Sequence, residues 1–235
     1  FNEESLIAYE LGFKSQFWGN RARFNAAVFM SDYDDFITTL GSLDPQFAAT
    51  IETVNVGEVT ISGAEMDLTI QLAEFSAFAA SYTYLDTELE DFIVPQDSFL
   101  KSPPANFGQD FRGQDISGDI SLVQAPRHAF TVSADHGMRL PNDSVVNLHL
   151  DWIYRTEVNS NPNTGNTVPS LGLLNARLSL DDVSIGESSS VSVGLWAQNL
   201  ANEETEVYII GSPQTLQGRQ FARPRTYGVD VRINF

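Results

Sequence analysis

The feature that most constrains this chain is a strict alternation of apolar and polar residues in long segments. The last segment, 227–235, reads YGVDVRINF, with an apolar side chain at every second position. Successive side chains of a strand point to opposite faces, so this pattern predicts a strand with one apolar and one polar face. The apolar face would be the core of a soluble sandwich, or the lipid-facing surface of a transmembrane barrel with a polar lumen.

The same alternation recurs along the whole chain and favours the barrel. Strands are expected at about 5–17, 23–40, 56–72, 78–84, 126–134, 146–154, 174–180, 191–197 and 227–235. The connections near 19, 74, 142 and 186 are short, and those near 48, 107, 163 and 211 are long. A transmembrane barrel has this bias, with tight turns at one rim and long loops at the other. An immunoglobulin-like sandwich would have shorter strands and no such bias.

Composition narrows the class further. The chain of 235 residues is 42% hydrophobic and 19% charged, which excludes a disordered chain. It has no run of about 18 apolar residues, so no transmembrane helix is expected. The net charge of −18 argues against nucleic acid as a partner. The absence of cysteine excludes disulfides and thiolate metal sites.

Several stretches carry a family resemblance. They read YELGFKSQF at 9–17, NAAVFMSDYDDF at 25–36, NVGE at 55–58, GAE at 63–65, SYTYLD at 81–86, DISG at 115–118, APRH at 125–128, LNARL at 174–178, NL at 199–200 and PRTYG at 224–228. In this order they resemble the C-terminal part of the β-barrel of TonB-dependent outer-membrane receptors. The resemblance covers nearly the whole chain, and the ordered set is far more specific than any one motif.

The resemblance implies an all-β fold, an antiparallel up-and-down transmembrane β-barrel in the cell outer membrane. It also implies energy-coupled uptake of a scarce small-molecule ligand such as siderophore-iron, cobalamin, haem or an oligosaccharide. The family barrel has about 22 strands, whereas nine are expected here. Residues 1–235 are therefore expected to be a C-terminal barrel segment, without the plug domain, the N-terminal strands or the box that contacts the energy-coupling complex. Neither a cofactor nor enzymatic activity is expected.

The resemblance also assigns a role to the final strand. Outer-membrane barrels commonly end on an aromatic residue that the barrel-assembly machinery recognises. Tyr227 and Phe235 are the residues of this chain that would form such a signal. The apolar face of this strand would contact outer-membrane lipid.

Ligand contact is expected from the long external connections. Aromatic residues beside a few polar groups suit the capture of a chelate or sugar. The candidates are Phe92, Phe99, Phe107, Phe111 and Arg112 in one connection and Arg219 and Arg223 in the last. Two alternatives stay open: the phenylalanines pack their connection onto itself, and the arginines balance acidic loops.

A second set of residues is expected to line the lumen. It consists of Glu10, Lys14, Glu65, Asp67, Asp151, Arg177, Asp230 and Arg232. These side chains would pair with one another or with the plug rather than contact ligand. Three histidines lack metal-ligand spacing, and Asp32, Asp34 and Asp35 favour solvated charges over a calcium site. A passive porin-like barrel is the alternative function, and an outer-membrane enzyme is a more distant one.

Overall fold

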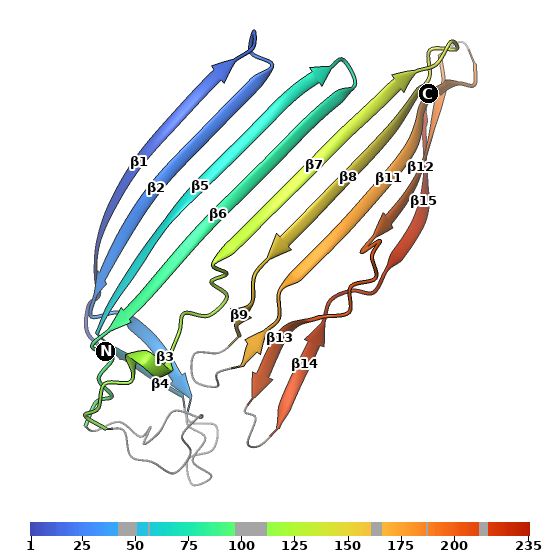
Figure 1. The fold of residues 1–235 in the computed structure, drawn as a ribbon. Coiled ribbons are helices and arrows are strands. Elements are labelled where there is room, and N and C mark those ends of the chain that lie inside the picture. Colours follow the sequence, from blue (N-terminus) through green and yellow to red (C-terminus); the bar gives the residue numbers. More distant parts are fainter. Residues whose placement is uncertain (42–50, 56, 97–111, 161–165, 187, 212–215) are drawn as a thin grey trace.

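The computed structural model describes residues 1–41, 51–55, 57–96, 112–160, 166–186, 188–211 and 216–235. Its main element is one antiparallel sheet of nine strands (Figure 1). The strands are β1 (Ser5–Phe17), β2 (Ala22–Asp34), β5 (Glu58–Ala73), β6 (Ser76–Glu90), β7 (His128–Arg139), β8 (Val145–Arg155), β11 (Leu171–Ser184), β12 (Ser190–Gln198) and β15 (Thr226–Asn234). The expected nine-stranded antiparallel architecture is confirmed.

Each strand of the sheet pairs with the next one along the chain, in the order β1-β2-β5-β6-β7-β8-β11-β12-β15. The strands contain from 9 to 16 residues, which is long for soluble proteins and sufficient for a tilted membrane crossing. Short turns join them at one end and long connections at the other, as Figure 1 shows. At the first short turn Trp18, Gly19 and Asn20 all have positive φ, which reverses the chain within a few residues.

The register of the sheet separates two faces. Val28 pairs with Ala64 and Ala64 with Tyr84, so these residues share one face, which we call the apolar face. Asn25, Asp67 and Ser81 are aligned in the same way on the opposite, polar face. The apolar face is exposed along its length in the described part of the chain: 54% of Val28 and 63% of Val229 are accessible. Exposed aliphatic side chains of this extent are the property of a lipid-facing wall.

Three small hairpins extend the sheet at the end with the long connections. They pair β3 (Ile37–Gly41) with β4 (Ile51–Asn55), β9 (Val158–Asn159) with β10 (Thr167–Val168), and β13 (Glu206–Gly211) with β14 (Gln217–Phe221). The expected single strand at 23–40 is therefore wrong. It breaks at Asp35, whose φ is 55°, and β3 leaves the sheet to pair with β4. The long connection expected near 211 likewise contains a hairpin.

Two clusters of buried apolar residues lie in the long connections rather than on the sheet. One consists of Val54, Phe92, Val94, Ile116 and Ile120, and the other of Val158, Val168 and Ile209. The second joins the β9–β10 hairpin to β13, and Ser160 Oγ donates to the carbonyl of Ile209 at 2.7 Å. The connections thus fold by burying their own apolar residues, while the sheet leaves its apolar face uncovered.

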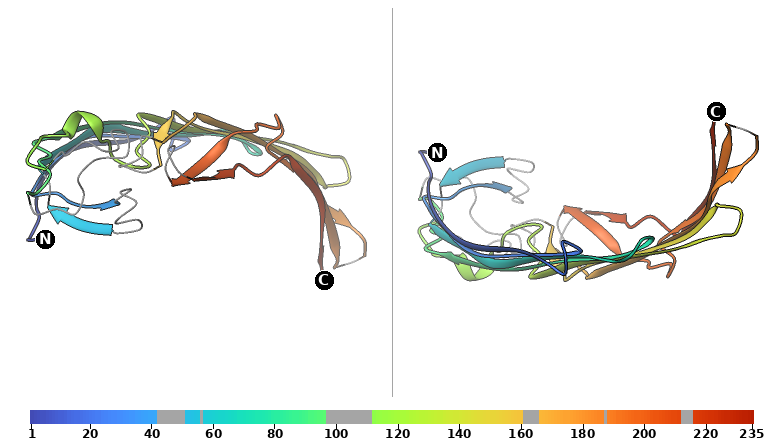
Figure 2. Two further views of the ribbon diagram at one scale, coloured as in Figure 1. Left: turned by 90° about the horizontal axis from the view of Figure 1, so that it is seen from below. Right: turned by 90° about the horizontal axis from the view of Figure 1, so that it is seen from above.

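The sheet is curved into an arch, with β1 at one end and β15 at the other (Figure 2). The β3–β4 and β13–β14 hairpins lie on the concave side of this arch. A 3₁₀ turn at Ser117–Asp119 is the one helical element of the described residues. No helix in this part of the chain is long and apolar enough to cross a membrane.

Candidate ligand-binding site

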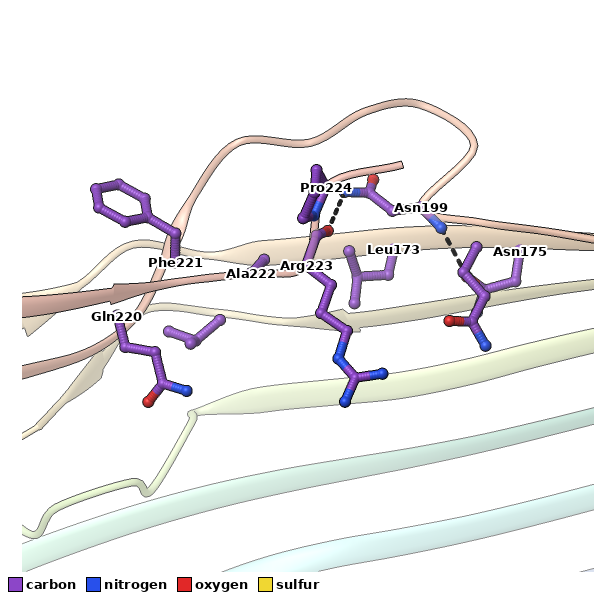
Figure 3. A pocket seen from close by; sticks show the side chains of 10 residues that line it. Leu173, Asn175, Asn199, Gln220, Phe221, Ala222, Arg223 and Pro224 are labelled. Atoms are coloured by element: carbon purple, nitrogen blue, oxygen red, sulfur yellow. Dashed lines mark hydrogen bonds between the residues drawn. The ribbon is translucent and has the colours of Figure 1, made fainter. Parts of the chain in front are cut away.

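A pocket of about 320 Å³ lies where the last long connection returns to the sheet (Figure 3). It is lined by Leu173, Asn175, Gln198, Asn199, Val207, Gln220, Phe221, Ala222, Arg223 and Pro224. The pocket therefore combines an apolar surface with side-chain amides and one guanidinium. This is the composition expected of a small-molecule site.

Three parts of the chain build the pocket. Its floor comes from β11 and β12, which contribute Leu173, Asn175 and Gln198 from the polar face. Its wall comes from the β13–β14 hairpin and the segment that leads to β15. Because that hairpin lies inside the arch (Figure 2), the polar face is the concave face of the sheet.

Asn199 connects these parts through its hydrogen bonds. Its Nδ2 donates to the carbonyl oxygens of Glu203 and Arg223, both at 2.9 Å, and its Oδ1 accepts from the Glu203 backbone N–H at 2.7 Å. Its own backbone N–H donates to Asn175 Oδ1 at 2.9 Å. Asn199 is 3% exposed and has a φ of 51°, a left-handed conformation that asparagine adopts more readily than most residues.

The two arginines predicted to attract ligand differ in their surroundings. Arg219 forms an ion pair with Glu206, and its Nη2 donates to Gln217 Oε1 at 3.0 Å. The guanidinium of Arg223 has no hydrogen-bond or ion-pair partner among the described residues, and in Figure 3 it points away from Asn199 and Pro224. Of these two arginines, Arg223 lines the pocket, whereas Arg219 is paired with Glu206.

The predicted aromatic contacts of the earlier connection are placed differently. Phe92 is 2% exposed and packs with Val94 and Ile116 in the buried cluster. Its side chain therefore stabilises the connection, in agreement with the packing alternative. Phe99, Phe107 and Phe111 lie outside the described residues. Arg112 is half-buried within the same connection.

The register places all eight residues of the predicted lumen set on the polar face. Arg177 and Asp230 form an ion pair, with Arg177 Nη2 2.8 Å from Asp230 Oδ2. Asp151 accepts from Asn175 Nδ2 at 2.7 Å. The other five residues form no ion pair within the part of the chain described. Their predicted role in lining a lumen stays a prediction.

His149 lies in the same polar network. Its Nδ1 is 2.7 Å from Asp135 Oδ1 and its Nε2 is 3.4 Å from Asp151 Oδ1. Together with Asn175 these residues form a continuous row of polar contacts that ends at Asn199. The residues Asn175, Gln198, Asn199 and Gln220 were missed by sequence reasoning, because uncharged amides carry no distinctive spacing.

The remaining candidates have structural explanations. Asp32 accepts a hydrogen bond from Thr60 Oγ1 at 3.0 Å, and the described residues contain no group of histidines and carboxylates arranged to hold a metal ion. His128 bonds Tyr82 on the apolar face at 2.8 Å. Tyr227 and Phe235, the predicted assembly signal, are 80% and 95% exposed.

A curved antiparallel sheet with an exposed apolar outer face and a polar concave face is the wall of a transmembrane β-barrel. The sequence of residues 1–200 matches the family described as TonB dependent receptor-like, beta-barrel. The chain belongs to this family, and its place is the outer membrane. The resemblance seen in the sequence motifs is thereby confirmed.

Solved structures support the same fold. The ferric yersiniabactin uptake receptor FyuA from Yersinia pestis superposes with a TM-score of 0.69 at 16% identity, over 99% of this chain and 30% of that one. The siderophore receptor PiuA from Acinetobacter baumannii gives 0.67 at 22% identity, over 97% and 28%. The ferric citrate transporter FecA gives 0.60 at 15%, over 97% and 31%. At these identities the likeness shows the fold. The chain spans about three tenths of these receptors, and no curated protein matches it.

Proposed function

We propose that this chain is part of an outer-membrane receptor that takes up a scarce small-molecule ligand by energy-coupled transport. Membership of the TonB-dependent receptor family supports this function. The similarity to receptors named for ferric siderophores and ferric citrate favours an iron chelate over cobalamin, haem or an oligosaccharide. The polar concave face would line the lumen through which such a ligand passes.

The observation that carries the proposal is the pocket beside Arg223. A guanidinium without a partner among the described residues, above an amide-lined floor, offers several donors to the oxygen atoms of an anionic chelate. Phe221 and Leu173 provide apolar surface for the rest of the ligand. The pocket lies at the end of the sheet with the long connections, which in a barrel of this family is the external rim. Arg223 is therefore the residue that we expect to contact ligand.

The same proposal covers the organisation of the receptor. The described strands leave β1 and β15 as the two edges of the sheet, and lipid does not tolerate unpaired edges. The matched receptors are also more than three times as long as this chain. Residues 1–235 would thus form the C-terminal part of a larger barrel, with the plug and the contact to the energy-coupling complex contributed by other parts of the receptor. The barrel-assembly machinery would bind the final strand.

Uptake by the complete receptor tests this function. Cells that express it are supplied with radioactive iron chelated by catecholate, hydroxamate or carboxylate siderophores, with and without a protonophore. We expect accumulation of at least one chelate, abolished when the proton gradient is collapsed. Accumulation that persists without the gradient would identify a passive porin-like barrel instead.

Two arginine variants test the site within the same assay. Arg223→Ala should raise the chelate concentration for half-maximal uptake by about tenfold or more, as loss of a charged hydrogen bond predicts. Arg219→Ala is the matched comparison, since its charge already pairs with Glu206, and we expect a smaller change. Equal effects of the two variants would contradict the assignment of Arg223 as the contact residue.

A further inference from the structure

The main chain of Arg223 is fixed on both sides, while its guanidinium has no partner among the described residues. On one side, the backbone N–H of Ala222 donates to the Thr205 carbonyl at 2.9 Å. On the other side, the Arg223 carbonyl accepts from Asn199 Nδ2 at 2.9 Å. Pro224 follows directly, and a residue before proline is restricted to extended backbone conformations. The guanidinium therefore projects from a defined point although it has no partner of its own within the described chain.

Asn199 is the residue on which this arrangement depends. It is buried, and its side-chain amide uses both Nδ2 protons and one Oδ1 position in bonds to the main chain of Glu203 and Arg223. Its backbone N–H is also bonded to Asn175, which belongs to the pocket floor (Figure 3). Asn199 thus ties the floor on β11, the loop after β12 and the entry to β15 together. It has no side-chain donor left for a ligand.

Few other residues can meet these requirements. The position needs a left-handed backbone, two side-chain donors and one acceptor at short reach. Aspartate has the shape and tolerates the backbone conformation, but its carboxylate would face two carbonyl oxygens. Glycine adopts the conformation easily but makes none of the side-chain bonds. Each substitution removes a different part of what Asn199 supplies.

We infer that Asn199 is a positioning residue for the ligand pocket, which sets the place of Arg223 and of the wall from Gln220 to Pro224 relative to the sheet. Preorganisation of this kind raises affinity because the ordering of the contact residue does not have to occur on binding. The inference rests on the proposed function in one respect, namely that Arg223 contacts the ligand. The positioning itself can be measured without any ligand.

A spin-label experiment on the complete receptor makes that measurement. This chain has no cysteine, so Arg223→Cys provides a labelling site here, with any cysteines elsewhere in the receptor replaced beforehand. A second label at Val229, on the apolar face of β15, reports the mobility of the strand itself. Each label is compared in receptor carrying Asn199, Asn199→Asp and Asn199→Gly. Asn234→Asp makes the same chemical change at the far end of β15 and is the control variant.

We expect the spectrum at position 223 to be the same with Asn199 and with Asn234→Asp, and to gain a more mobile component with Asn199→Asp and Asn199→Gly. The label at 229 should be unchanged throughout. A spectrum at 223 that is unchanged in both Asn199 variants would overturn the inference. Equal loosening at 223 and 229 would also overturn it, because Asn199 would then act on the whole strand. If Asn199→Asp does not assemble into heat-modifiable barrel, the glycine variant decides alone.

Uptake kinetics add a readout that a purely structural role would not move. Asn199→Asp should raise the chelate concentration for half-maximal uptake about as much as Arg223→Ala does, with little change in the maximal rate. The double variant should be no worse than Arg223→Ala alone, because Asn199 acts through Arg223. Additive effects of the two changes would contradict this coupling. Failure of the unaltered receptor to transport any chelate would instead count against the proposed function, and the label spectra would still decide the positioning.

Discussion

Arg177 on β11 reaches across the intervening strand β12 to form a two-pronged ion pair with Asp230 on β15. The register explains the path. Gly194 of β12 lies between Ser179 of β11 and Asp230 of β15, on the same polar face. A side chain at this glycine would bring its Cβ into collision with the Arg177 guanidinium. Gly194 therefore leaves the space through which the guanidinium reaches its partner.

Replacement of Gly194 should disconnect this pair. In Gly194→Val the guanidinium must move away from Asp230, so Asp230→Asn should destabilise the parent barrel but have little further effect in the valine background. Urea unfolding of the complete receptor in lipid vesicles measures the effect of Asp230→Asn in the parent and in the Gly194→Val background. Gly186→Val is the control, because nothing lies within 4 Å of the corresponding Cβ. The same Asp230→Asn effect in both backgrounds would contradict the role of Gly194.

The assignment of the apolar face to lipid predicts an asymmetric response to charge. Leu150 lies on this face and is 38% exposed, so Leu150→Arg should destabilise the inserted barrel by about 2–4 kcal/mol if it lies near the membrane midplane. Asn147→Arg, on the polar face of the same strand, should cost much less because Asp181 lies beside it. Denaturant titrations of folding into lipid vesicles compare the free energies of folding of the Leu150→Arg and Asn147→Arg variants. Equal tolerance would show that the faces are assigned incorrectly.

The buried cluster of the connection between β6 and β7 should fold as a local unit. Phe92→Ala removes its largest buried side chain, and a loss of about 3–5 kcal/mol is expected for such a truncation. Because the sheet does not contain Phe92, the loss should appear as faster proteolysis of this connection, with unchanged heat-modifiability of the barrel. Ile93→Ala is the matched control, since the side chain of Ile93 is 50% exposed. Equal proteolysis of both variants would count against the cluster.

Acid should weaken one contact of the same connection. The backbone N–H of Ser117 donates to Asp115 Oδ1 at 2.9 Å and lowers the pKa of Asp115 below its ordinary value of 3.8. A lowered pKa means that the ionised form stabilises the fold at pH values above 3.8, and that this stabilisation disappears as the pH falls through the lower, folded value. The Ser117 amide resonance should titrate with a midpoint below 3.8 and lose this titration in Asp115→Asn. A midpoint at or above 3.8 would contradict the contact.

Much of the sheet was predictable from local pattern. The strand expected at 5–17 coincides with β1, because period-two alternation is a property of neighbouring residues and needs no tertiary information. The break at Asp35 was not predictable, because the apolar residues Phe36, Ile37 and Leu40 still follow it in the sequence after the chain has left the sheet. The β13–β14 hairpin was missed for a related reason: Gln217–Phe221 is mostly polar, and its strand state comes from pairing with β13.

The sequence by itself determined the class of this protein: an antiparallel sheet with one apolar and one polar face, short turns at one end and long connections at the other. Only the tertiary structure decided the site. Asn175, Asn199 and Arg223 are each 24 residues from the next, and no periodic signal links them. They meet because β11 and β12 are neighbours in the sheet and the last connection returns to the end of β12. Contacts between strands and loops depend on that return path, which alternation within a strand does not encode.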